Sequence, residues 1–376
     1  MNKIQAALFQ QDFTTVFQLL NNGESWNIND SNTQQALQNI IKTENFKLLH
    51  LLIEKDVFSL DIFEYDRFRN SIFEIFTQVP FTDGIKAFLE TIISDIENID
   101  DELEGTTWLG LAISNNSDKE LVDFLIENGC DINTIDTKER TYLFKTEDVK
   151  TTEFLINQGI DINKKDLLGE TAFYEVVVSK NTELIQFYLD NGIDVNSQNN
   201  KGETVYDVVC FKILDAQIFE QLTNHEPLRL DLKDTHGQSL FLKVATNVYC
   251  DIQIEILKIM LNNGADLFQE EIDRYGDTVT VSDILAHKEI KVLQMLNDNG
   301  FIDVETADNK GNTWLHKVCM QELNFEQRKA QEMYKKVKLL TKAGANPNLK
   351  NDEDKSPIDY AQNDNLKAKV LQLLMN

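Results

Sequence analysis

The sequence predicts an all-α protein made of stacked helix–turn–helix units, and three observations support this prediction. A nine-residue phrase with a central Gly recurs at 125–133 (LIENGCDIN), 155–163 (LINQGIDIN) and 188–196 (YLDNGIDVN). The glycines of these copies, Gly129, Gly159 and Gly192, follow one another at nearly regular intervals. A second phrase, Gly-x-Thr/Ser followed by apolar residues, precedes each predicted pair of helices. Repetition at such a period indicates small units that stack on one another.

The second phrase predicts where each first helix begins. It reads GTTWL at 105–109, GETAF at 169–173, GETVY at 202–206, GQSLF at 237–241 and GNTWLH at 311–316. Its Gly suits a turn that needs a positive φ, and its Thr or Ser suits the N-cap of the following helix. The Gly of the first phrase suits the C′ position after a second helix. Each unit is therefore expected to be two short helices with a loop that projects between units.

Other units depart from this pattern in length or sequence. Weaker copies of the first phrase lie at 261–266, 299–304 and 340–348. The interval between Gly192 and Gly264 is long enough for two units, so a degraded copy is expected near 224–227. The unit at 137–166 is shorter than its neighbours, which predicts that one of its helices is truncated. The segment 324–338 instead predicts an elongated second helix, and 324–342 carries six basic and two acidic residues.

The sequence resembles the ankyrin repeat family. A period of about 33 residues and the pattern T-P-L-H-x-A mark that family. The segment 313–318 (TWLHKV) matches the pattern with Trp for Pro and Val for Ala, and 356–361 (SPIDYA) keeps the Pro but has Asp for His. The resemblance covers about 101–376 and is faint over 1–100. It implies an ankyrin-type helical repeat solenoid of about ten or eleven units, whose loop tips and inner helices form a concave binding surface.

The expected domain organisation follows from the strength of the repeat. Residues 1–100 are predicted to be degenerate N-terminal repeats or a helical cap, 101–350 ankyrin-like repeats, and 351–376 a C-terminal capping repeat. Faint copies of the repeat at 17–23 and 51–56 favour repeats in this first segment. A separate helical N-terminal domain followed by eight units is the alternative.

Composition limits the classes of partner. The chain has 36 Lys and Arg against 63 Asp and Glu, a formal net charge of −27, and 42% hydrophobic residues. This charge opposes binding to phosphate backbones and favours a protein partner with a basic surface. No window of the sequence is apolar over the length that a transmembrane helix needs, so no membrane partner is expected. The four cysteines are widely separated along the chain and form no C-x-x-C pair. We expect buried free thiols, a reducing compartment and hence a cytoplasmic location.

Motifs for catalysis and for cofactors are missing from the sequence. The five histidines form no H-E-x-x-H motif, and neither G-x-S-x-G nor G-x-x-x-x-G-K-[ST] occurs. We therefore expect no enzymatic activity, no cofactor and no metal site. His316 occupies the position of the His in the family pattern, where the resemblance implies a hydrogen bond to neighbouring loops.

The candidate partner-binding residues lie at predicted loop tips. Two tips are acidic, one exposes leucines and one carries a cation beside an aromatic ring, which are side chains enriched in interface anchors. These residues are Asp101, Glu102, Leu167, Leu168, Arg274, Tyr275, Asp352, Glu353 and Asp354. The acidic tips could also be solvated loops, and the leucines could fold back onto the adjacent loop.

These features predict a non-enzymatic protein-binding scaffold. A strong negative charge accelerates association with a basic protein. Acidic ankyrin-like proteins that resemble this chain neutralise cognate toxins in bacteria, and the Asn-, Gln- and Ile-rich composition suggests a bacterial source. Our hypothesis is an acidic antidote (immunity-type) protein. A translocated effector that binds a host protein, or an adaptor in a larger complex, is the alternative.

Overall fold

The computed structural model describes residues 3–26, 33–65, 67–68, 71–362 and 364–375 of the chain. The chain divides into two compact units. Unit 1 comprises Met1–Val176 and Asn181–Ile193, and unit 2 comprises Val177–Lys180 and Asp194–Asn376. The sequence analysis predicted boundaries near residues 100 and 350. The division into two units does not test these boundaries, which stay a prediction.

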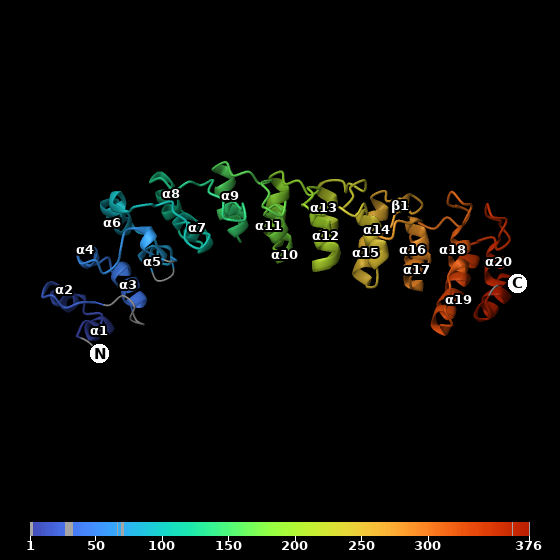
Figure 1. Ribbon diagram of the computed structural model, residues 1–376, viewed down its shortest axis with the longest axis horizontal. Helices are drawn as coiled ribbons and strands as arrows, with labels where there is room; N and C mark the ends of the chain where they lie inside the picture. Colours follow the sequence, from blue (N-terminus) through green and yellow to red (C-terminus); the bar gives the residue numbers. More distant parts are fainter. Residues whose placement is uncertain (1–2, 27–32, 66, 69–70, 363, 376) are drawn as a thin grey trace. The chain divides into compact units, whose positions relative to one another are not determined.

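Unit 1 consists of helices that follow one another in pairs (Figure 1). The pairs are α1 (Lys3–Phe9) and α2 (Phe13–Asn21), α3 (Thr33–Lys42) and α4 (Phe46–Glu54), α5 (Ile72–Thr77) and α6 (Asp83–Ile92), α7 (Trp108–Ser114) and α8 (Lys119–Glu127), and the 3-10 helix η3 (Tyr142–Lys145) and α9 (Val149–Asn157). Two further 3-10 helices, η1 (Ile62–Glu64) and η2 (Ile93–Asp95), lie in loops. Helix α10 (Phe173–Ser179) begins in unit 1 and ends in unit 2, and its partner α11 (Thr182–Asp190) lies in unit 1.

Unit 2 continues the same arrangement. It contains α12 (Val205–Asp207), which runs into the π-helix η4 (Val208–Ile213), and α13 (Ala216–His225), then α14 (Leu240–Asn247) and α15 (Asp251–Asn262), α16 (Val281–Ala286) and α17 (Ile290–Asp298), α18 (Trp314–Met320) and α19 (Gln327–Lys342), and α20 (Pro357–Gln362), η5 (Asn365–Lys367) and α21 (Ala368–Leu374). Over the described residues the chain thus forms eleven helical pairs, which confirms the predicted repeat solenoid of ten or eleven units.

The sequence signals set the helix ends as predicted. Thr107 and Ser239 cap α7 and α14, because their hydroxyls accept the N–H groups of Gly110 and Leu242 at 3.0 Å each. Gly129 follows α8 with a φ of +108°, and its N–H bonds to the carbonyl of Ile126. The next N–H, that of Cys130, bonds to the carbonyl of Leu125. This pair of hydrogen bonds is a Schellman motif, which ends the helix and turns the chain toward the next loop.

Buried aromatic side chains join neighbouring pairs. Trp108 is fully buried at the start of α7, with its ring centroid 4.9 Å from that of Phe73 in α5. Its indole N–H donates to the carbonyl of Phe73 at 3.0 Å, so the polar atom of this large side chain is satisfied. Trp314 occupies the equivalent position in α18 and is also fully buried. Both tryptophans are therefore packing residues.

Irregular units show how sequence length changes a repeat. In the short repeat at 137–166, the first helix is reduced to the 3-10 helix η3, which confirms the predicted truncation. The residue with positive φ that ends the first helix lies nine positions after Thr171 (Lys180) but ten after Thr204 (Leu214). The repeat that begins at Thr204 thus has one extra residue in its first helix. The helix accommodates it as the π-helix η4, which is the usual effect of a one-residue insertion.

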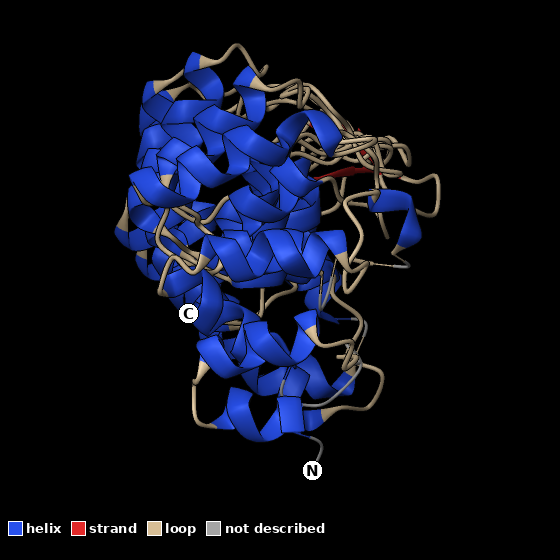
Figure 2. Ribbon diagram, turned by 90° about the vertical axis from the view of Figure 1, so that its left-hand side faces the viewer, coloured by secondary structure: helices blue, strands red, loops and turns tan. Residues whose placement is uncertain are grey.

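A short β-hairpin is the one feature outside the all-α prediction among the described residues (Figure 2). Strands β1 (Glu270–Ile272) and β2 (Thr278–Thr280) pair antiparallel, with Glu271 opposite Val279. The loop from Gly264 to the N-cap Thr280 is longer than the corresponding loop from Gly192 to Thr204. The additional residues make this loop long enough for β1 and β2 to form backbone hydrogen bonds with each other. Within the described residues, no helix is long and apolar enough to cross a membrane.

Candidate partner-binding surface

Among the described residues, seven loops between successive repeats are each organised around one Asp or Asn side chain. The Oδ1 atom of this side chain accepts the backbone N–H groups of the residues two and four positions further on, at 2.8–3.1 Å. The residues in this role are Asp136, Asp166, Asn199, Asp234, Asp273, Asp308 and Asn351. A side chain that replaces missing backbone partners holds a loop in one conformation. The loop tips are therefore pre-organised.

Neighbouring loops are also joined to each other. In unit 1 the N–H of Leu167 donates to the carbonyl of Lys138 at 2.9 Å. In unit 2 the N–H of Thr235 donates to the carbonyl of Lys201 at 2.9 Å, and a matching bond links the loops at 308–312 and 351–355. The close approach requires glycine at one tip: a Cβ on Gly202 would lie 2.7 Å from the Cα of Asp234, and Gly202 has a φ of +74°. These backbone hydrogen bonds join three pairs of neighbouring loops.

The acidic tip of unit 1 is a tight hairpin turn. Leu103 and Thr106 pair across it, and the two central residues, Glu104 and Gly105, have φ values of +50° and +83°. Two positive φ values are typical of a type I′ turn. Glu102 is exposed beside this turn, whereas Asp101 is half-buried and Leu103 is buried. Of the two acidic candidates at this tip, Glu102 is therefore the one that is more accessible to solvent and to a partner.

Asp100, next to this tip, lies in a crowded acidic environment. Its carboxylate accepts the N–H of Asp131 at 3.2 Å. Burial raises the pKa of Asp100, and the nearby charges of Asp131 and Asp101 raise it further. A positive charge from a partner would relieve this repulsion.

Leu167 and Leu168 lie at the tip of the loop at 164–170 of unit 1, two loops after the acidic tip. Their side chains are 52% and 59% exposed. Their backbone is held by Asp166, whose side chain is 3% exposed and lies 3.6 Å from Nε of Arg140. The backbone of this loop is hydrogen-bonded to its neighbour, and the two leucine side chains remain slightly more than half exposed. They form a fixed apolar tip flanked by Lys165 and Glu170.

In unit 2, Arg274 and Tyr275 occupy the tip of the β1–β2 hairpin. Tyr275 is 75% exposed, and the guanidinium carbon of Arg274 lies 4.9 Å from the centroid of its ring. The cation thus shields one face of the ring. The other face of Tyr275 remains a candidate contact, as does the exposed Ile272 of β1.

Asp352, Glu353 and Asp354 are all exposed at the tip between α19 and α20, and part of their charge is already paired. Asp354 forms an ion pair with Lys350 at 2.8 Å, and Glu353 accepts the hydroxyl of Tyr360 at 3.3 Å. The structure places two of the four candidate tips in unit 1 and two in unit 2.

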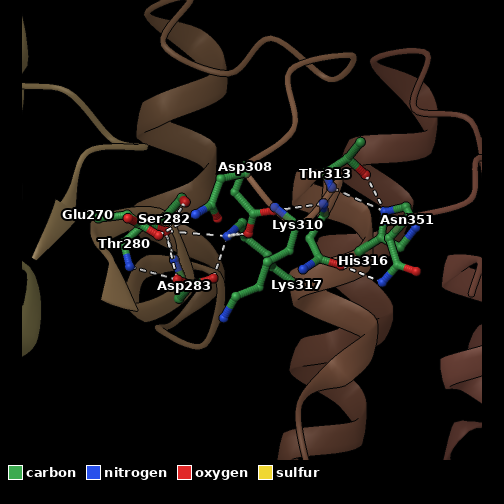
Figure 3. A network of polar contacts seen from close by, with 12 residues as sticks. Glu270, Thr280, Ser282, Asp283, Asp308, Lys310, Thr313, His316, Lys317 and Asn351 are labelled. Carbon is green, nitrogen blue, oxygen red and sulfur yellow. Dashed lines mark hydrogen bonds and ion pairs between the residues drawn. The ribbon is translucent and has the colours of Figure 1, made fainter. Parts of the chain in front are cut away.

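A buried lysine joins adjacent pairs of unit 2, and sequence reasoning missed it (Figure 3). Lys317 in α18 is 2% exposed, and its Nζ contacts the carboxylates of Asp308, at 2.6 Å, and Asp283. Asp308 belongs to the loop that precedes α18 in the same repeat. Asp283 lies in the first turn of α16, in the preceding repeat of unit 2. Burial acts to raise the pKa of Asp308, but the hydrogen bond and charge of Lys317 and the backbone N–H groups of Asn312 and Lys310 together outweigh it, and the pKa is lowered.

The same arrangement occurs at an earlier pair of unit 2. Nζ of Lys243 lies 2.5 Å from the carboxylate of Asp207, which belongs to the preceding repeat of unit 2, and 3.3 Å from the carboxylate of the loop residue Asp234. Lys243 and Lys317 both follow the capping Ser or Thr by four positions, so the spacing S/T-x-x-x-K could have revealed them. In unit 1, Lys145 follows Thr141 by four and donates to the carbonyl of Gly105 at 3.3 Å.

His316 has the structural role that was expected. The backbone N–H of Thr313 donates to its Nδ1 at 3.1 Å, so Nε2 carries the proton and donates to the carbonyl of Lys355 at 3.2 Å. Burial lowers the pKa of His316, which keeps the ring neutral near pH 7. The ring links the loop before α18 to the loop before α20.

The cysteines are free, and Cys130, Cys210 and Cys319 are buried as predicted, whereas Cys250 is half-buried. Burial raises the pKa of Cys130 and of Cys319 to about 12, so these thiols are poor nucleophiles. In the part of the chain that the structure describes, no three His, Cys, Asp or Glu side chains are grouped to hold a metal ion.

Comparison with solved structures finds proteins of similar fold. The ankyrin repeat domain of Bcl-3, a member of the IkappaB protein family, matches with 16% identity and a TM-score of 0.46, over 60% of this chain and 93% of that one. EF0377, an ankyrin repeat protein, matches with 22% identity and a TM-score of 0.41, over 54% of this chain and 96% of that one. No protein-family model and no curated protein matches the sequence. The helix pairs, glycine-ended second helices and joined loops of the chain itself are those of an all-α helical repeat solenoid of the ankyrin type.

Proposed function

We propose that this chain is a non-enzymatic scaffold that binds a protein partner through the loop tips of unit 1. The observation that supports this most directly is the fixed apolar tip at Leu167 and Leu168, where two leucines are more than half exposed. Because Asp166 and the neighbouring loop already hold the backbone, binding there costs little conformational entropy. Exposed apolar side chains on a rigid loop favour an interface over a solvated turn.

The charge of unit 1 favours a basic partner. Unit 1 contains 14 Lys and Arg residues against 34 Asp and Glu, a net formal charge of −20 of the total of −27. The loops at 136–140 and 164–170 mix both signs, so the acidic tip around Glu102 is the local focus. We expect a partner with an apolar patch for the leucines and cations for the acidic tip.

Within this class we favour an acidic antidote that neutralises a basic protein toxin in the cytoplasm. An antidote must capture its target before damage occurs, and a large opposite charge increases the rate of association. This reasoning rests on the charge of unit 1 and on the preformed tip.

The test is affinity capture of the tagged full-length chain from its own cells at about 50 and about 500 mM salt, which bracket weak and strong screening. Two variants probe the tips: Glu102→Lys with Glu104→Lys, and Leu167→Ser with Leu168→Ser. The matched control is Arg274→Ser with Tyr275→Ser, an exposed tip in unit 2. Each captured protein is then expressed alone and together with the chain, and cell growth is measured.

The proposal predicts one stoichiometric basic protein that stops growth when expressed alone. Both unit 1 variants should reduce its capture at least tenfold, whereas the unit 2 variant should not. Equal capture by all variants would place the interface elsewhere. An empty capture would contradict neutralisation within the cell and favour an effector whose partner is in another cell.

A further inference from the structure

Helix α19 is much longer than the second helices on either side of it. It has 16 residues, whereas α17 has nine and α21 has seven. At 1.5 Å per residue, α19 spans about 24 Å and its neighbours about 10–14 Å. The carboxylate of Glu332 accepts the N–H of Ile290, the first residue of α17, at 3.0 Å. Residues 327–331 of α19 therefore lie beyond the first turn of α17.

A groove of about 820 Å³ lies along this extended part of α19, between it and α21. Ala330, Tyr334, Leu366 and Leu373 give it apolar surface, and each is at least partly exposed. Along the chain, α19 is followed by α20 and then by the shorter η5 and α21, and these groove side chains remain accessible to a partner.

The spacing of the groove residues suits a helix as occupant. On one side, 327, 330, 331 and 334 repeat at helical intervals along α19, and on the other side 366, 369, 370 and 373 do so along η5 and α21. Two helix faces with i, i+3, i+4 and i+7 spacing form ridges into which a third helix can pack. Helix-in-groove recognition uses the same spacing of apolar anchors on the bound segment.

The charge at the groove is opposite to that of the chain. Its described lining includes Lys335 and Lys369 and contains no Asp or Glu, although acidic residues outnumber basic ones 63 to 36 in the whole chain. Lys335 shares its charge with Glu332 at 2.7 Å, and Lys369 forms no ion pair with another described residue. Charge complementarity therefore selects an occupant with carboxylates beside its apolar face.

We propose that the groove between α19 and α21 binds an amphipathic acidic helix of a second protein partner. This interface is separate from the loop tips of unit 1 and opposite to them in the charge that it accepts. The chain would then connect a basic protein at unit 1 with an acidic helical segment at the end of unit 2.

The test uses a displayed library of random helical peptides, each about four turns long, selected on the full-length chain. A counter-selection uses Ala330→Arg, which fills the groove with a good helix former and so preserves α19. Enriched peptides are then measured by fluorescence polarisation against Lys335→Glu with Lys369→Glu. Lys342→Glu, an exposed lysine of α19 outside the groove, is the matched control, and circular dichroism checks the fold of every variant.

The proposal predicts acidic peptides with apolar residues at i, i+3 or i+4, and i+7. Ala330→Arg and the double charge reversal should each weaken their binding at least tenfold, and Lys342→Glu should change it less than threefold. Peptides that bind Ala330→Arg equally well, or that are basic, would overturn the proposal, as would no enrichment over Ala330→Arg. Dimers of the wild-type chain that Ala330→Arg dissociates would instead assign the groove to a second copy.

Discussion

Replacing Lys317 with Met should locally destabilise unit 2, because the ammonium of Lys317 neutralises two carboxylates in a buried position. Methionine keeps the length and packing of the side chain but leaves Asp308, whose side chain is 5% exposed, without its cation. Removing one partner of a buried ion pair costs about 3–5 kcal/mol. The lower end applies here, because the side chain of Asp283 is 39% exposed and Oδ1 of Asp308 keeps two N–H donors.

A loss of about 3 kcal/mol corresponds to a roughly hundredfold increase in local opening. Hydrogen exchange with mass spectrometry should therefore show about hundredfold lower protection across α16 and α18, and no change in α8 of unit 1. Lys310→Met is the control, since Lys310 is exposed in the same loop and only its backbone contacts Asp308.

A second substitution separates lost charge from lost packing. Asp308→Asn in the Lys317→Met background removes the unpaired carboxylate while keeping an acceptor for the loop N–H groups. It should restore about half of the lost protection or more. If Lys317→Met leaves protection within threefold of wild type, or if Lys310→Met has the same effect, the ion pair does not hold these repeats together.

Two further predictions concern Lys336 and the tip glycine. Burial lowers the pKa of Lys336 from 10.5 to about 8, so between these values the unfolded chain binds more protons and stability rises with pH. Urea unfolding at pH 7 and pH 9.5 should show wild type gaining about 2 kcal/mol relative to Lys336→Met, and a pH-independent difference would contradict this. Gly202→Ala should cost about 1–3 kcal/mol more than Gly237→Ala, because both glycines have positive φ but only Gly202 has a backbone neighbour where the Cβ would be. Equal melting temperatures for these two variants would show that the joined loops can separate freely.

The local structure of this chain could be read from its sequence because short-range signals determine it. A Thr or Ser before an apolar run caps a helix, and a Gly after one ends it, whatever lies nearby. The truncated first helix of the 137–166 unit and the long α19 were likewise predicted from the length of chain between these signals. The role of His316 followed from a resemblance whose motif fixes its place beside Thr313.

Only the tertiary structure decided which side chains meet across units. Asp308 and Asp283 belong to different repeats and are far apart in the sequence, and no local pattern assigns both to Lys317. Asp101 is half-buried and Glu102 is exposed because of the hairpin turn at Glu104 and Gly105. The sequence pattern did not predict this turn. The groove at α19 exists because two neighbouring helices are shorter, a difference that acquires meaning only once the three are stacked. Sequence by itself determined the repeat and its helix ends through local hydrogen bonding, whereas burial, ion pairing and exposed surface depend on stacking and were decided by the fold.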